Sequence, residues 1–199
     1  MLIEVGMLPD EALPLAAFKA HLRQGTGFSE TDVQEPVLTG FLRAALAAVE
    51  ARIGKALIAR PFTWTTSRWR DAGREELPIA PVRAVTGVTV VDRWGAETAL
   101  DVAGFGLEAD SMRPRVAAHD GTLPAIPAGG KVVIGFDAGF ADDWAGVPGD
   151  VAQAVFLLAA HYYEYRDETS LARGCMPFGV QSLLERYRPM RLFSGGGAA

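Results

Sequence analysis

In the stretch LTGFLRAALAAVEARIGKALIARPFTWTTSRW, residues 38–69, the spacing of the apolar residues changes from that of a helix to that of a strand. In its first half these residues recur at helical spacing, at Leu38, Phe41, Leu42, Ala45, Leu46, Val49, Ile53 and Leu57. Charged residues such as Glu50 fall largely off this stripe, as they do on the solvent face of a helix. Just upstream, Thr31 and Gln34 have the spacing of a capping box. We therefore expect a helix over residues 31–57.

The second half of the same stretch has the two-residue period of a strand. β-Forming residues follow Pro61, and Phe62–Trp69 predicts a strand with its aromatic side chains on one face. Apolar and β-branched runs predict further extended segments at Val82–Val91, Phe105–Leu107, Arg113–Val116 and Lys131–Phe136. Glycines and prolines between these runs are typical of hairpin turns. The pattern indicates a β-rich insertion over residues 58–140.

Helical spacing returns after Gly149. Residues 151–166, VAQAVFLLAAHYYEYR, are apolar on nearly every side of a helix, which is typical of a helix buried on most sides. We expect both the core of the chain and a partner subunit to cover it. The predicted subunit-interface residues are Val155, Phe156, Leu158, Tyr162 and Tyr163.

Two shorter helices are predicted near the ends, over residues 14–22 and 180–187. The expected fold class is therefore α+β, a helical core of two main helices plus short terminal helices, with a β-rich insertion between them. Neither a repeat nor a linker divides the sequence, so we expect one domain over residues 1–199. Its predicted parts are a helical core (10–57 and 149–188), the β-rich insertion (58–140) and a C-terminal docking tail (188–199).

Composition and charge limit the function. The 199 residues are 49% hydrophobic and 22% charged, typical of a globular protein with its own core. The single cysteine, Cys175, forms neither an intrachain disulfide nor a thiolate zinc site alone. The first residues lack the pattern of a secretory signal, and no apolar run is long enough to span a membrane. We expect a soluble intracellular protein with no membrane partner.

A few residues invite a catalytic interpretation. Asp137, Asp142, Asp143 and Asp150 cluster in the glycine-rich loop 137–150. Together with His161, which has Glu164 three residues later, they raise the alternative of a metal-dependent hydrolase. The calcium-loop pattern is absent, however, and the competing interpretation is a solvated loop in which Asp150 caps or charges the start of a helix. We predict no enzyme activity, no catalytic residue, no metal site and no cofactor.

A second alternative is an adaptor that binds nucleic acid. Trp64 and Trp69 on the predicted strand could stack on bases, and Arg68 and Arg70 lie beside them. The formal net charge is −5, whereas nucleic-acid binders usually concentrate basic residues on one surface. Packing of the two tryptophans in a core or an interface is the competing interpretation.

Taken in order, these segments resemble the head–tail connector, or adaptor, proteins of long-tailed bacteriophages and related gene transfer agents. The resemblance rests on Leu15–Arg23, the long helix ending in Gly54–Leu57, Leu77–Val82, Val85–Asp92, Ala138–Phe140, Val147–Pro148, Ala152–Arg166 and Met176–Pro189. It implies a structural virion component at the head–tail junction, assembled in the bacterial cytoplasm. Such proteins form a ring, commonly twelvefold, under the portal protein, extend the DNA channel and join the capsid to the next tail-proximal stopper or tail-completion protein. DNA is expected to pass without specific binding.

The end of the chain differs in charge from the rest. Residues 173–199 carry four Arg and one Glu, a net charge of +3, so residues 1–172 carry −8. Apolar side chains follow the last predicted helix, and in connectors of this family the C-terminal segment is associated with docking onto the portal. We expect portal binding by Arg186, Tyr187, Arg188, Met190, Arg191, Leu192 and Phe193.

Overall fold

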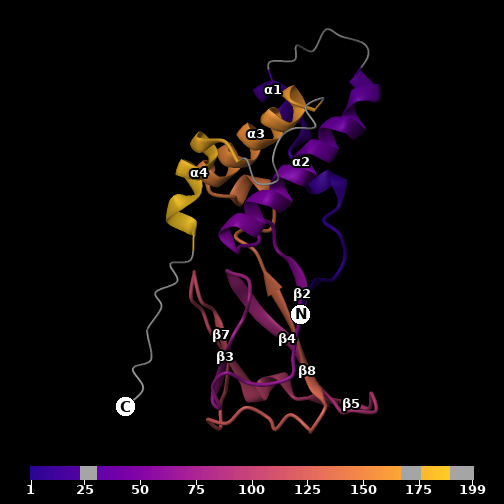
Figure 1. Cartoon of the computed structure of the whole chain (residues 1–199), viewed down its shortest axis with the longest axis vertical. Coiled ribbons are helices and arrows are strands. Elements are labelled where there is room, and N and C mark those ends of the chain that lie inside the picture. The colour runs from indigo at the N-terminus through magenta and orange to yellow at the C-terminus, as the bar shows by residue number, and fades with distance from the viewer. Residues whose placement is uncertain (23–30, 167–175, 189–199) are drawn as a thin grey trace.

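The helices and the strands lie at opposite ends of an elongated molecule (Figure 1). The computed structural model describes residues 1–22, 31–166 and 176–188. Helices and antiparallel sheets both contribute, so the fold is α+β, as the sequence predicts. No helix within these ranges is long and apolar enough to cross a membrane.

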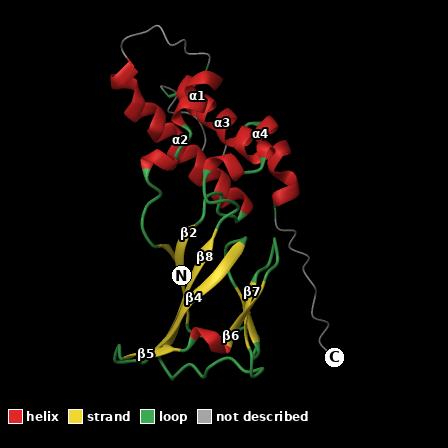
Figure 2. Cartoon of the chain, turned by 180° about the vertical axis from the view of Figure 1, so that it is seen from behind, coloured by secondary structure: helices red, strands yellow, loops and turns green. Residues whose placement is uncertain are grey.

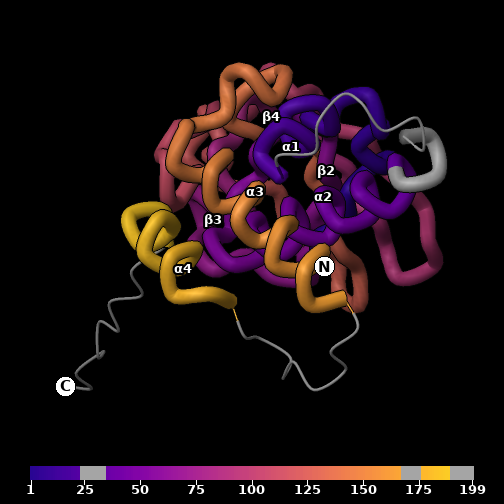
Figure 3. The backbone as a smooth tube through the Cα atoms, turned by 90° about the horizontal axis from the view of Figure 1, so that it is seen from above, coloured from indigo at the N-terminus to yellow at the C-terminus, as the bar shows by residue number. Residues whose placement is uncertain are grey.

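Two long helices form the centre of the helical end. Helix α2 (Thr31–Ile53) packs against α3 (Gly149–Glu164), and α3 lies between α2 and α4 (Phe178–Leu184) when seen from above (Figure 3). The short α1 (Leu15–His21) contacts α2 and inserts the fully buried Phe18. Single 3-10 turns occur at Asp10–Ala12, Val102–Gly104, Trp144–Gly146 and Glu185–Tyr187.

Helix α2 is shorter than the sequence pattern suggests. It ends at Ile53 rather than at residue 57, because Gly54 takes a left-handed conformation (φ +66°) that stops the helix. The apolar residues that follow remain buried, but as the connection into the first long strand rather than as a further turn of helix.

The apolar circumference of α3 is covered largely within the chain. Val151, Ala154, Val155, Leu158 and Ala159 are all at most 1% exposed, because α2 and α4 pack on them. Val155 and Leu158 were predicted to meet a neighbouring subunit, but their side chains do not reach the surface. Phe156, Tyr162 and Tyr163 are only half-buried.

The strands form two antiparallel sheets (Figure 2). The larger has the order β1-β2-β8-β4-β5, built from Leu2–Glu4, Arg60–Thr66, Lys131–Ala138, Val82–Val91 and Glu97–Leu100. The smaller has the order β3-β7-β6, built from Arg74–Glu76, Arg115–Ala118 and Phe105–Glu108. A second core lies on the inner face of the larger sheet, with Phe62, Ile134 and Phe136 among its buried members.

The β-rich end is not made solely by residues 58–140. The N-terminal strand β1 pairs with β2 as an edge of the larger sheet, with Ile3 opposite Thr63. The sequence pattern did not predict this strand. The first long strand begins at Arg60 and ends at Thr66, so Trp69 lies beyond it in the following loop, although it still packs on the sheet core.

Candidate assembly surfaces

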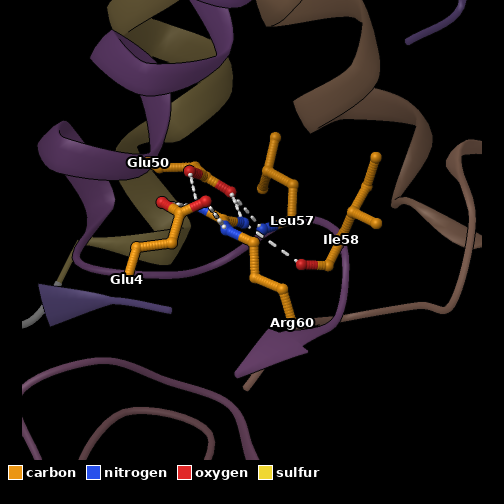
Figure 4. A network of polar contacts seen from close by, with 5 residues as sticks. All are labelled: Glu4, Glu50, Leu57, Ile58 and Arg60. Carbon is orange, nitrogen blue, oxygen red and sulfur yellow. Dashed lines mark hydrogen bonds and ion pairs between the residues drawn. The ribbon is translucent and has the colours of Figure 1, made fainter. Parts of the chain in front are cut away.

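A buried ionic network joins the helical end to the larger sheet (Figure 4). Glu50 of α2, which is 8% exposed, accepts hydrogen bonds from Arg60 Nη1 at 2.9 Å and Nη2 at 2.7 Å. Its Oε1 also accepts from the Leu57 amide at 2.7 Å. Arg60 Nε lies 2.7 Å from Oε1 of Glu4 on β1. One guanidinium therefore holds α2, β2 and β1 together.

The charge of Arg60 is fixed by these partners. Burial alone would lower the pKa of the guanidinium, but the hydrogen bonds and negative charges of Glu50 and Glu4 outweigh burial and raise that pKa. Since the sequence pattern placed Glu50 on a solvent face, the pattern gave no signal of this contact. In the sequence, the contact is indicated only by the opposite charges of Glu50 and Arg60, which lie on either side of the connection between α2 and β2.

A second contact ties the same connection to the smaller sheet. Lys55 is 3% exposed and its Nζ donates to the Ser111 carbonyl in the loop between β6 and β7. Burial lowers the pKa of the Lys55 ammonium, and the nearby Asp110 carboxylate opposes this shift. The Ala56 amide also donates to the Ala80 carbonyl at 2.9 Å. The helical end and both sheets are thus connected by hydrogen bonds.

The last described turn is attached to the start of α3. The Tyr187 hydroxyl donates to Asp150 Oδ1 at 2.7 Å, and its ring meets Phe140 edge-on at 6.0 Å between centroids. Arg186 lies 3.4 Å from Asp150 Oδ2 and stacks over the Tyr187 ring. Burial, together with the hydrogen bond to Asp150 and its charge, raises the pKa of the Tyr187 phenol. Asp150 therefore supplies charge to the first turn of α3 and anchors residues 186–187.

The predicted portal-binding residues fall into two groups. Arg186 and Arg188 are exposed, whereas the half-buried Tyr187 is engaged with Asp150. Arg188 Nη1 pairs with Glu185 at 3.2 Å. Met190, Arg191, Leu192 and Phe193 lie outside the described residues.

The half-buried aromatic residues of α3 contact other elements of the same chain. The Phe156 ring lies 6.0 Å from Phe18 and 5.4 Å from Trp144, measured between centroids. Tyr163 meets Phe41 edge-on at 6.2 Å. These contacts position the outward parts of Phe156 and Tyr163, and Tyr162 packs partly against the same helical core.

The acidic loop 137–150 shows no arrangement suited to metal chemistry. Asp142 pairs with Arg83, and Asp143 accepts from the Gly146 amide at 3.3 Å. His161 lies at the other end of α3, where its ring is 4.7 Å from that of Tyr165. Within residues 1–22, 31–166 and 176–188, no group of three or more His, Cys, Asp and Glu could hold a metal ion. Cys175 lies outside these ranges.

The tryptophans of the candidate nucleic-acid strand belong to the sheet core. Trp64 and Trp69 are half-buried against it, and Trp69 Nε1 donates to the Pro124 carbonyl at 2.7 Å. Arg68 and Arg70 are exposed beside them. The packing interpretation of the tryptophans is confirmed, and no stacking platform results.

The structure also shows an apolar surface that sequence reasoning missed. Five of the first seven residues carry large apolar side chains that are 38–79% exposed: Met1, Leu2, Ile3, Val5 and Met7. They lie on and around β1, the edge of the larger sheet. The alternation of Ile3, Glu4 and Val5 was the available signal, but three residues of strand are too few to stand out in a sequence.

Comparison with solved structures gives the assignment. The chain matches a chain in the neck of an empty gene transfer agent particle computed with C6 symmetry at 49% identity, with a TM-score of 0.88. It also matches a chain in the neck of a native particle computed with C12 symmetry at 46% identity and a TM-score of 0.82. Each match covers 98% of both chains. The chain belongs to the family of these neck proteins.

A third match within the family is to a chain in the virion of a native gene transfer agent particle, at 48% identity with a TM-score of 0.85 and 98% coverage of both chains. No protein-family model matches this neck protein, and no curated protein matches it. The family membership therefore rests on similarity to solved particle structures along almost the whole chain.

Proposed function

We propose that this neck protein is a structural connector at the head–tail junction of a gene transfer agent or phage-like particle. It forms a ring under the portal protein, extends the DNA channel and joins the filled head to the next tail-proximal protein. The observation that carries the proposal is the match to neck chains over 98% of the sequence at 46–49% identity. At this identity the whole fold, rather than one motif, is shared.

We propose a ring of twelve copies of this chain. The matched necks were computed with C6 and C12 symmetry, and a ring of twelve subunits is compatible with both. Closed rings use head-to-tail contacts, in which two different surfaces of each subunit meet. The outward parts of Phe156, Tyr162 and Tyr163 are proposed to contribute to these contacts.

The charge of the chain suits a passage for DNA. The formal net charge is −5, and the larger part of the chain, residues 1–172, carries −8. Concentrated positive charge would retain DNA by releasing its counterions, so an acidic wall lets DNA slide. The role proposed for this chain is mechanical and needs no catalytic group.

Portal binding is assigned to the C-terminal segment. Arg186 and Tyr187 are held against Asp150, so the last described turn is fixed to the start of α3. Arg188 and the residues after it, including Arg191 and Phe193, are proposed to contact the portal. Twelve such contacts act together, so each can be weak while the joint is stable.

Removing the gene from a particle-producing strain tests the proposal. We expect filled heads without tails, and tailed particles again when the wild-type gene is returned. Tailed particles formed at the normal level without the gene would contradict the connector role.

A pair of truncations tests the portal assignment. Deletion of residues 188–199 is expected to leave a folded protein that no longer attaches to filled heads. The matched control, deletion of residues 194–199, removes only the glycine-rich end and should still attach. If both truncated proteins attach equally well, the C-terminal segment does not bind the portal.

A further inference from the structure

The larger sheet ends in two open edges. Its strand order places β1 at one end and β5 at the other, and neither edge pairs with another described strand. Open edges present unpaired backbone groups that can accept a strand from another molecule. In most proteins charged side chains or prolines protect such edges.

The backbone groups of β1 can be assigned to one side or the other. The Met1 amine and carbonyl both bond to Thr65, and the Val5 amide donates to the Pro61 carbonyl at 2.9 Å. Since successive residues of an antiparallel strand point their N–H and C=O groups to opposite sides, those of Leu2 and Glu4 point away from β2. Four backbone groups therefore face the open side of the sheet.

The same edges carry much of the exposed apolar surface of the protein. Ten large apolar side chains are exposed in the part of the chain that the structure describes, and six of them lie at these two edges. Five are on or beside β1, and the sixth is Trp94, which is 76% exposed in the turn between β4 and β5. Apolar patches of this kind mark contact surfaces.

We propose that β1 of one copy of this chain pairs with β5 of the next copy around the ring, so that the larger sheet continues from subunit to subunit. The inference rests on the proposed ring. A head-to-tail ring needs two different surfaces on each subunit, and the two ends of one sheet supply them. Pairing of β1 with β1 would instead produce twofold dimers, which do not close a sixfold or twelvefold ring.

The pairing also accounts for the side chains. Strand addition supplies hydrogen bonds through the main chain, and side chains that flank the strand supply further contact. Because β1 and β5 run in the same direction in the sheet, Met1 at the start of β1 then lies nearest to Trp94 of the next copy, which precedes β5. A methionine side chain packs well against an indole. The contact covers apolar groups that the isolated chain leaves in water.

Cross-linking through introduced thiols tests the pairing. The strand register places Ile3 in line with Thr63 and Gly135, and Ala99 in line with Thr89 and Val133, all on the same outer face of the sheet. Within one copy the two edges are four strand spacings apart, roughly 19 Å. A short bismaleimide therefore joins these two positions only between copies.

The experiment uses purified particles that carry the Ile3→Cys/Ala99→Cys double variant in a Cys175→Ser background. We expect a ladder of covalent multiples of the chain, and no ladder from either single variant. The matched control, Ile3→Cys/Ser182→Cys, places the second thiol on α4 and should give no ladder. Dimers from the Ile3→Cys single variant, joining of the thiols to a different protein, or no joining at all would overturn the proposal.

A second pair of variants separates the backbone from the side chain. Glu4→Ala and Glu4→Pro both remove the ion pair with Arg60, but only proline removes the outward amide, and an edge strand tolerates proline there. If the two variants have equal free energies of unfolding, Glu4→Pro should enter particles at least tenfold less than Glu4→Ala does. Equal incorporation would contradict strand pairing. If even the wild-type chain is absent from purified particles, that result contradicts the proposed function itself.

Discussion

Replacing Arg60 by methionine tests the network that connects the helical end to the larger sheet. The substitution keeps an unbranched side chain but removes the cation from the Glu50 carboxylate, whose side chain is 9% exposed. Among residues 1–22, 31–166 and 176–188, Glu50 then keeps only the Leu57 amide as a hydrogen-bond donor. The Glu50 carboxylate must then either stay charged in a buried site without its cation or take up a proton, and both cost free energy.

The expected cost follows from the burial of both partners. The Arg60 side chain is only 10% exposed, so solvent screens the pair weakly. Breaking a buried ion pair by removing one partner costs about 3–5 kcal/mol. Since Glu50 retains the Leu57 amide, we expect a loss near 3 kcal/mol. In a chain of this size that loss lowers the melting temperature by about 6–12 °C.

Urea unfolding of the wild type, Arg60→Met and the double variant Glu50→Gln/Arg60→Met measures this effect. The double variant leaves a neutral amide that can still accept from Leu57, so it should be more stable than Arg60→Met by about 1 kcal/mol or more. Either of two results would show that the network does not stabilise the fold: a free energy of unfolding for Arg60→Met within about 1 kcal/mol of the wild type, or a double variant that is the least stable of the three.

Two further predictions concern glycine positions and alkaline pH. Gly139 has φ +152°, and a Cβ there would lie 2.4 Å from Ala59 backbone atoms, so Gly139→Ala should lower the free energy of unfolding by about 3 kcal/mol. At the control position Gly40 a Cβ would have nothing within 4 Å, so Gly40→Ala should stabilise α2 by about 0.5–1 kcal/mol. Urea unfolding measures both effects. The raised pKa of Tyr187 means that the folded state holds the phenol proton more tightly, so its contribution to the free energy of unfolding is complete below the ordinary pKa of 10.0 and is lost as pH rises through the folded-state pKa. Below pH 10, Tyr187→Phe should lower the free energy of unfolding by about 1–2 kcal/mol. Above the folded-state pKa of Tyr187, the gap in unfolding free energy between the variant and the wild type should shrink. A gap that stays constant with pH would show that the hydrogen bond to Asp150 is not the cause.

The main elements could be predicted because each long segment has a clear period. The change at Pro61 from helical to alternating spacing marks the start of β2 within one residue. The apolar runs that end at Val91 and begin at Lys131 became β4 and β8, the two longest strands. Periodicity reports burial of one face, and these segments bury one face.

Other features depend on contacts that periodicity does not report. Glu50 lies off the apolar stripe, yet it is buried because Arg60 comes back across the helix end to meet it. The end of α2 at Ile53 was predicted four residues too late, because Ala56 and Leu57 continue the apolar pattern beyond Gly54 while packing in the sheet core and the helical core, respectively. For α3, the pattern showed how much surface is apolar but not that α2 and α4 cover Val155 and Leu158.

The candidate surfaces were predictable to different degrees. The basic C-terminal end was visible in the charges alone, while the edge strand β1 was too short to give a pattern. Its significance depends on which strand it pairs with and on the side to which Leu2 and Glu4 point, and both are properties of the assembled sheet.

Single-particle imaging of purified particles in which this chain carries a small tag tests the connector role most directly. We expect a ring of tag density between the capsid and the tail, with twelve copies in each particle, in keeping with the C12 symmetry of the matched neck. Tag density spread over the capsid shell or along the tail, or a chain that is absent from tailed particles, would contradict it.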